Sequence, residues 1–182
     1  MAKPVYLREL KQKDLEKIYQ SLDNEEILYM TGTKKTFTFE QVVNHYEACQ
    51  KDETRHDFAI CLTKNDEMIG DLAIVEIEEG NRKAGFRISL HQTTILGKGY
   101  GTEAVKQALA FTFNELKLNR LQLEVYSHNL RGYYAYKKAG FVEEGRLRQS
   151  LYMNGTYSDE IIMAVLREDY EKMRGNEGSV RE

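Results

Sequence analysis

The chain has 182 residues, of which 41% are hydrophobic and 30% charged, a composition typical of one globular domain with its own core. A net charge of −3 argues against nucleic acid as a partner, because nucleic-acid binders usually carry a basic excess. No apolar run reaches the roughly 18 residues of a membrane span. The N-terminus also lacks the apolar core of a signal peptide. We therefore expect a cytoplasmic protein with no membrane partner.

The two cysteines, Cys49 and Cys61, form no metal-ligand spacing with the four histidines. No metal site is expected from this arrangement. Both thiols are expected to be reduced, as in other cytoplasmic proteins.

The first half of the chain changes from helical to strand periodicity. A short strand from residue 5 is expected to give way at Asp14 to a helix with apolar residues at helical spacing. A second helix is expected over 38–49, where Thr38 and Gln41 fit a capping box. Three strands should follow as an antiparallel meander, at 56–63, 67–77 and 83–90.

The second half alternates helices and strands. Local signals mark two of the boundaries: Gly140 can end a helix in the left-handed conformation, and Asn154-Gly155 is a strong hairpin signal. The expected elements are a helix starting at Glu103 and reaching residue 116, a strand at 120–127, a helix at 129–139, a terminal hairpin and a loose polar tail at 175–182. Together they predict a single α+β domain over residues 1–174 with a mixed sheet.

The sequence LGKGYGTEA at 96–104 places three glycines directly before a helix. Glycine lets backbone N–H groups turn toward a ligand, and a helix N-terminus favours an anion. A P-loop is excluded, because Lys98 is followed by Gly99 rather than Ser or Thr. A Rossmann loop fits less well, because most strands precede the loop. A tight turn without a ligand would need fewer glycines, so the loop favours pyrophosphate binding through N–H groups from Leu96 to Thr102.

A second motif lies downstream in LEVYSHNLRGYYAYKKAGF. With Gly99 and Gly101 in the loop, and with Asn129, Tyr136 and Gly140-Phe141 at the family's separation, the chain resembles the GNAT acetyltransferase superfamily. It is most similar to the branch of ribosomal-protein N-terminal acetyltransferases and spermidine N-acetyltransferases. The sequence departs from the family pattern at Leu96, where Gln or Arg is usual.

The resemblance implies transfer of an acetyl group from acetyl-CoA to a primary amine. It also implies a mixed, mostly antiparallel sheet with helices on both faces, and a splayed strand pair that holds the acyl-CoA. The pantetheine arm should pair with the edge of the strand at 83–90, and Asn129 should contact this arm. The expected cofactor-binding residues are Ile88, Ser89, Leu90, Leu96, Gly97, Lys98, Gly99, Tyr100, Gly101, Thr102 and Asn129.

Two residues are candidates for proton transfer. Tyr136 could be one of several packing tyrosines, but its position in the motif favours a general acid for the leaving thiolate. Glu124 lies on the strand face opposite Leu121, Leu123 and Val125 and could be a solvated carboxylate. The resemblance to protein N-terminal acetyltransferases favours a general base instead. No Cys or Ser stands beside a base, so direct attack by the amine is expected.

The sequence leaves the acceptor open between a protein N-terminus and a small polyamine. The acidity of the chain favours a polyamine, whereas the basic segment at 31–40 opposes it. The acidic pair Glu25 and Glu26 is interpreted as a solvated helix end. The alternative function is an acyl-CoA-binding regulatory module without turnover. A homodimer is expected only from the habits of the superfamily.

Overall fold

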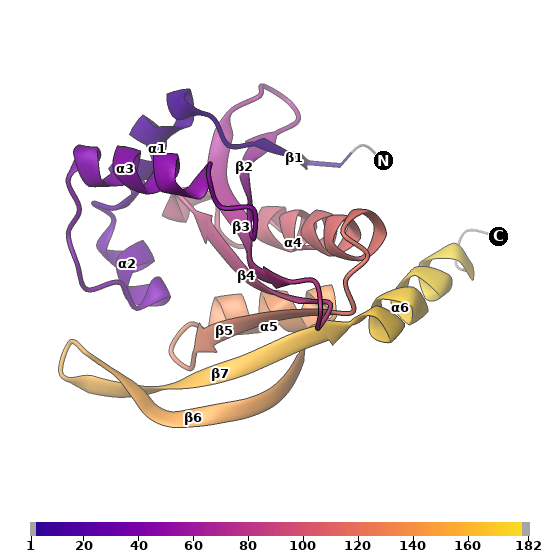
Figure 1. The fold of residues 1–182 in the computed structure, drawn as a ribbon. Coiled ribbons are helices and arrows are strands. Elements are labelled where there is room, and N and C mark those ends of the chain that lie inside the picture. Colours follow the sequence, from indigo (N-terminus) through magenta and orange to yellow (C-terminus); the bar gives the residue numbers. More distant parts are fainter. Residues whose placement is uncertain (1–2, 180–182) are drawn as a thin grey trace.

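The computed structural model describes residues 3–179 and shows one seven-stranded sheet flanked by helices (Figure 1). The strands are β1 (Val5–Glu9), β2 (His56–Leu62), β3 (Met68–Glu78), β4 (Lys83–Leu90), β5 (Arg120–Tyr126), β6 (Val142–Met153) and β7 (Thr156–Leu166). The helices are α1 (Leu15–Ser21), α2 (Glu25–Thr31), α3 (Phe39–Cys49), α4 (Tyr100–Ala110), α5 (Leu130–Ala139) and α6 (Arg167–Ser179), and a π-helical turn (Phe111–Glu115) extends α4.

The sheet has the order β1-β2-β3-β4-β5-β7-β6 and is antiparallel except between β4 and β5. Those two parallel strands pair at only three positions, from Lys83–Arg120 to Gly85–Gln122. Beyond them the strands separate, and the second half of β4 has a strand partner only on its β3 side. The expected meander, mixed sheet and splayed strand pair are confirmed.

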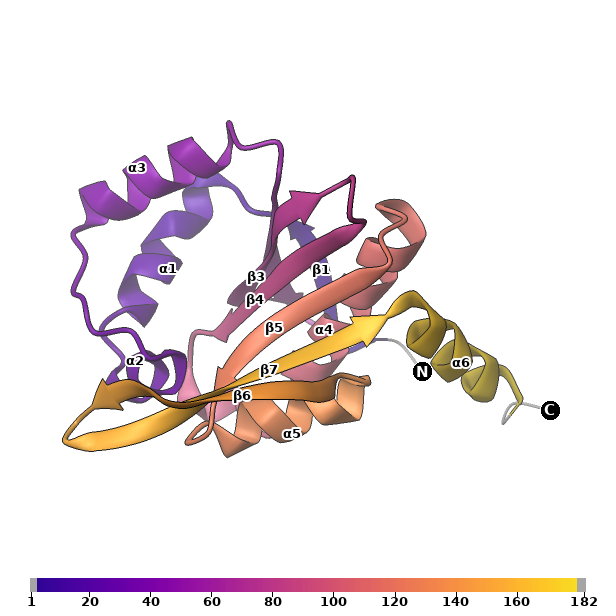
Figure 2. The ribbon, with the colours of Figure 1, turned by 60° about the horizontal axis from the view of Figure 1, so that its bottom comes forward.

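The two faces of the sheet carry different helices (Figure 2). Successive side chains of β2 pack on opposite faces of the sheet, because neighbouring strand residues point in opposite directions. Ile60 and Leu62 pack with Val105 and Leu109 of α4, whereas Ala59 and Cys61 belong to a second cluster that contacts Ile18 of α1. Helices α4 and α5 therefore cover one face, and α1 and α3 cover part of the other; helices on both faces are what the sequence predicts.

Three of the boundaries that the sequence predicts are found in the structure. Thr38 and Gln41 form a capping box at the start of α3. Gly140 ends α5 with a φ of 107°. Asn154 and Gly155 turn the β6–β7 hairpin with φ values of 51° and 77°, the pair of positive angles that a two-residue hairpin turn requires.

Two boundaries differ from expectation. Helix α4 begins at Tyr100, with Gly99 as its N-cap, rather than at Glu103. The helix signal at Glu103 was read from side-chain periodicity, which does not register glycines in a first turn. Helix α6 reaches Ser179, so the expected loose tail is wrong for residues 175–179, and residues 180–182 lie outside the described part of the chain.

Candidate active site

The glycine loop adopts a conformation that side chains disfavour. Gly97 and Gly99 have φ values of 75° and 83°, in the left-handed region. A Cβ at either position would meet no heavy atom within 4 Å, so the backbone there faces open space. Gly101 differs: its φ is not positive, and a Cβ would lie 3.5 Å from Leu90 Cδ1, an ordinary contact. The positive φ that favours glycine is therefore present at Gly99 and absent at Gly101.

The first turn of α4 presents free backbone donors to this space. The first hydrogen bond within the helix runs from Glu103 N to Gly99 O over 3.0 Å. The N–H groups of Tyr100, Gly101 and Thr102 precede it and have no partner within the helix. Leu96 N, in contrast, donates to Thr93 O over 3.1 Å. The expected run of anion-binding donors therefore excludes Leu96 and centres on the helix N-terminus, where partial positive charge favours an anion.

A cavity of about 360 Å³ opens beside this loop. It lies between the loop, the free half of β4 and helices α2 and α5. Of the residues predicted to bind the cofactor, those that line it are Ile88, Ser89, Leu90, Leu96, Gly97, Gly99, Tyr100, Gly101, Thr102 and Asn129. Lys98 is exposed and is not among its lining residues. The cavity therefore joins the anion-binding turn to an unpaired strand edge, which suits a long ligand with a phosphorylated end and an amide-containing arm.

Tyr136 also lines this cavity. Its ring packs edge-on against Phe141, with 6.0 Å between centroids. Burial raises the pKa of the Tyr136 phenol to about 12, because the charged phenolate is poorly solvated there. The hydroxyl group is consequently protonated at neutral pH and can serve as a proton donor.

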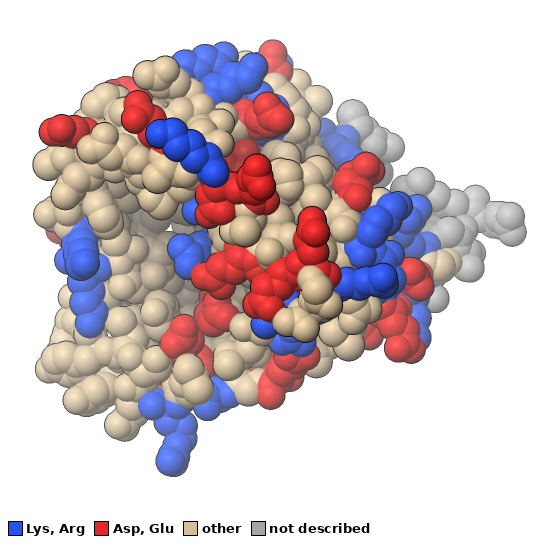
Figure 3. Space-filling view, viewed as in Figure 1, with Lys and Arg blue, Asp and Glu red and all other residues tan. Residues whose placement is uncertain are grey.

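Glu124 is not in the same cavity. It lies on the opposite, open face of the sheet, in a smaller concavity of about 90 Å³ whose other charged lining residues are Glu76, Glu78, Lys83, Arg87 and Arg120. Figure 3 shows acidic side chains gathered across the middle of this face. Glu124 is two residues beyond the last β4–β5 pair, so it stands at the mouth of the gap between the separating strands. The two predicted catalytic residues therefore approach this gap from opposite faces.

Helix α2 forms a wall of the cavity that sequence reasoning missed. Ile27, Met30 and Thr31 line the cavity from α2. Glu26, in the exposed first turn of α2, is a solvated helix end as the sequence predicts, and it also lines the cavity and pairs with Arg131 of α5 at 3.2 Å. The sequence signal was available in Asn24, which caps α2 by accepting a hydrogen bond from Ile27 N.

The turn between β5 and α5 fastens α2 in place. Asn129 Oδ1 accepts from Gly132 N over 2.9 Å and caps α5, and its Nδ2 donates to Met30 O over 3.3 Å. His128, to which the sequence assigns no role, donates from Nε2 to Tyr29 O over 2.8 Å. Both side chains join segments about a hundred positions apart along the chain, which no local pattern could reveal.

Two findings concern other classes of site. Within residues 3–179, no three His, Cys, Asp or Glu side chains come together in a way that could hold a metal ion. No helix in the same part of the chain is both long and apolar enough to cross a membrane.

Comparison with known proteins agrees with the geometry of the loop and cavity. The family model described as an acetyltransferase (GNAT) domain matches residues 5–142. The chain belongs to the GNAT acetyltransferase family. It is therefore an N-acetyltransferase that uses acetyl-CoA as donor, and the enzymatic prediction is confirmed in preference to a module without turnover.

Its relatives include both groups that the sequence suggests. The chain is 30% identical to the probable N-acetyltransferase YjcK of Bacillus subtilis, over 93% of this chain and 98% of that protein. It is 29% identical to the spermidine N(1)-acetyltransferase of Escherichia coli K12, over 93% of this chain and 89% of that protein. A shorter match, 30% identical over 57% of this chain and 56% of that protein, joins it to the putative ribosomal N-acetyltransferase YdaF of B. subtilis.

A solved structure extends the likeness to three dimensions. The spermidine N-acetyltransferase of Vibrio cholerae, in complex with CoA and spermine, superimposes with a TM-score of 0.86 and 27% identity. The match covers 93% of this chain and 99% of that one.

Proposed function

We propose that this enzyme acetylates a primary amine of a small polyamine. The observation that carries the proposal is the Glu124 carboxylate at the mouth of the β4–β5 gap, in a concavity that Glu76 also lines. Lys83, Arg87 and Arg120 line the same concavity, and Lys83 pairs with Glu78, so Glu76 and Glu124 are the carboxylates that would meet the acceptor. A polyamine carries several ammonium groups, and carboxylates attract such cations. The named relatives support the same acceptor class, since they include spermidine acetyltransferases and one structure with bound spermine.

Separate segments of the chain would bind the different parts of acetyl-CoA. The N–H groups of Tyr100, Gly101 and Thr102 would hold the pyrophosphate of acetyl-CoA at the start of α4. The open edge of β4 at Ile88–Leu90 would pair with the peptide-like arm. An N–H of this edge would polarise the thioester carbonyl, as an oxyanion hole does. Asn129 and Lys98 remain predicted cofactor contacts.

Glu124 and Tyr136 would divide the proton transfers. Glu124, through a water molecule, takes one proton from the acceptor ammonium and leaves a neutral amine. That nitrogen forms the C–N bond as the C–S bond breaks. Tyr136 gives its phenolic proton to the leaving sulfur and regains one from the new amide nitrogen. The products are the acetylated amine, CoA thiol and one proton on Glu124, so no acyl-enzyme is needed.

A protein N-terminus is the second candidate acceptor. The match to a putative ribosomal acetyltransferase favours it. The basic pair Lys34 and Lys35, which follows α2, also disfavours a polycation at that rim. A homodimer remains a prediction, and one related V. cholerae spermidine acetyltransferase is described as dodecameric.

The test is release of CoA thiol with spermidine, a short peptide with a free N-terminus, the same peptide with an acetylated N-terminus, and an aminoglycoside. We expect the highest kcat/KM with spermidine. A response to the free peptide alone would transfer the proposal to protein N-termini. A response to the aminoglycoside alone would contradict both acceptors.

A further inference from the structure

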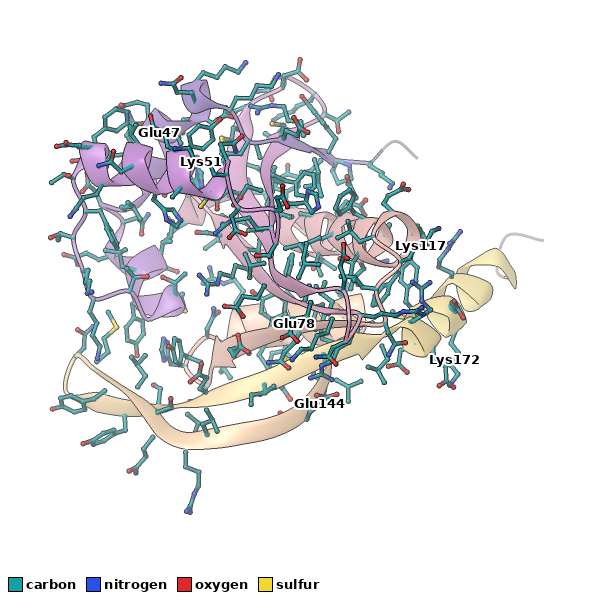
Figure 4. The ribbon with its side chains drawn as sticks, in the orientation of Figure 1. Glu47, Lys51, Glu78, Lys117, Glu144 and Lys172 are labelled. Atoms are coloured by element: carbon teal, nitrogen blue, oxygen red, sulfur yellow. The ribbon has the colours of Figure 1, made fainter. Side chains whose placement is uncertain are left out.

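Four side chains form a hydrogen-bonded row along the open face of β5. Arg120 donates to both carboxylate oxygens of Glu144, over 2.9 and 2.6 Å. Glu144 lies on the edge strand β6 and is labelled in Figure 4. Arg120 Nη2 also donates to Gln122 Oε1 over 2.7 Å, and Gln122 Nε2 donates to Glu124 Oε1 over 2.8 Å. A carboxylate, a guanidinium and an amide therefore stand in series before the Glu124 carboxylate.

The row has only one workable direction of donation. A guanidinium can only donate hydrogen bonds, and an ionised carboxylate can only accept them. Gln122 must therefore turn its carbonyl oxygen toward Arg120 and its NH₂ group toward Glu124. A reversed amide would set oxygen against oxygen at Glu124 and N–H against N–H at Arg120. Arg120, itself held by Glu144, thus fixes which end of the amide reaches Glu124.

The row also crosses the point where β4 and β5 separate. Gln122 is the last β5 residue paired with β4, opposite Gly85. Glu124 pairs only with Ile162 of β7, since β4 has already diverged. The bond from Gln122 therefore ties a side chain at the mouth of the gap to the part of β5 that is held on both sides.

We propose that Gln122, oriented by Arg120, is a positioning residue that aims Glu124 at the acceptor amine. This inference rests on the proposed role of Glu124 as general base. With Oε1 engaged by Gln122, Oε2 is the oxygen that receives the acceptor's proton.

The test is the pH profile of kcat/KM for the acceptor in the wild type, Gln122→Met, Arg120→Lys and Glu124→Gln. Methionine keeps the length of Gln122 and removes its donor. We expect Gln122→Met to lower kcat/KM for the acceptor about tenfold, through kcat rather than KM, because the base is no longer held toward the amine. Arg120→Lys retains the positive charge but not the planar set of N–H donors, so it should lower kcat by a smaller factor. The KM for acetyl-CoA should stay within about twofold, because these residues lie on the opposite face from the cofactor cavity.

The matched control is Gln20→Met on α1. Gln20 Nε2 makes the same kind of bond, to Glu16 Oε1 over 3.0 Å, away from β5, and its loss should leave the profile unchanged. An acidic limb that persists in Glu124→Gln overturns the base itself. A limb that flattens in Glu124→Gln, together with an unchanged kcat in both Gln122→Met and Arg120→Lys, overturns the positioning role alone. Thermal unfolding of each variant identifies any loss of activity that comes from misfolding.

Discussion

His128 stacks on Tyr29 with 4.2 Å between ring centroids and donates to the carbonyl oxygen of the same residue. On its other side, Nδ1 lies 2.8 Å from the hydroxyl of Ser158 in β7, which can donate to it. One imidazole ring thus joins α2, the end of β5 and the β6–β7 hairpin. Since α2 walls the cofactor cavity, the ring sets the position of that wall.

Replacing His128 with alanine should therefore affect both stability and donor binding. The loss of two hydrogen bonds and a ring stack should lower the free energy of unfolding by about 1–3 kcal/mol. A less firmly held α2 should raise the KM for acetyl-CoA. Denaturant unfolding and initial-rate kinetics measure the two effects. His45→Ala on α3, where the ring is exposed, is the control and should change stability by no more than about 0.5 kcal/mol.

The loop prediction concerns Gly99, which caps α4 in the left-handed conformation. Alanine at a φ of 83° costs about 1–2 kcal/mol of strain. Relief of that strain would turn the N–H groups of the first turn away from the cavity. Gly99→Ala should then raise the KM for acetyl-CoA several-fold more than that for the amine. Gly80→Ala, at an open position without positive φ, is the matched control. Equal effects on both substrates would show that the loop does not hold the donor.

The sequence predicts best what short-range physics determines. Alternation in β5 identifies the buried face with Leu121, Leu123 and Val125, and it correctly places Glu124 on the other face. The turn at Asn154-Gly155 and the cap at Gly140 follow from backbone sterics within a few residues. These signals suffice for the order of the strands and for the glycine loop, but not for helix α2 or the full length of α6.

The remaining features depend on contacts that are distant in sequence. Glu26 lines the cavity and pairs with Arg131 of α5, and no periodicity relates those two positions. The separation of Glu124 from Tyr136 depends on which face of the sheet receives α5. Strand periodicity identifies two faces, but it does not say which helix covers each.

A second stability prediction concerns the buried pair of Arg8 and Asp14. Arg8 donates two hydrogen bonds of 2.7 Å to the Asp14 carboxylate, whose side chain is only 5% exposed. Burial acts to raise the pKa of Asp14, but the bonds from Arg8 and Lys11 N outweigh it and lower the pKa. Stability from this carboxylate is therefore present above about pH 4 and is lost as the pH falls through the lowered folded-state pKa.

Asp14→Asn should remove that stability by leaving Arg8 without its counter-charge. We expect a loss of about 3 kcal/mol near neutral pH, measured by denaturant unfolding, and a smaller difference from the wild type at acidic pH. Asp23→Asn, at a surface position, is the control. A loss that is the same at pH 7 and pH 3 would show that the charge of Asp14 is not the cause.

The last prediction tests Tyr136 in catalysis and in folding with one substitution. Tyr136→Phe keeps the ring that packs on Phe141 and removes only the hydroxyl group. If that hydroxyl protonates the leaving sulfur, kcat should fall by about 10²–10⁴-fold while the dissociation constant for acetyl-CoA changes little. Near-full turnover across the pH range would make Tyr136 a packing residue.

The same variant also tests whether the Tyr136 phenol is buried, through the stability of the protein at alkaline pH. Burial raises the folded-state pKa of Tyr136 from about 10 to about 12, so the folded state retains a proton that the unfolded state has released. The contribution of the protonated Tyr136 phenol to the free energy of unfolding is fully present below about pH 10 and is lost as the pH rises toward 12. The wild type should therefore lose stability relative to Tyr136→Phe over this interval and run parallel to it at lower pH. Thermal unfolding of both proteins from pH 7 to 11.5 measures the difference. Parallel curves throughout would mean that the phenol is well solvated, and a solvated phenol would also be a poor candidate for a shielded proton donor.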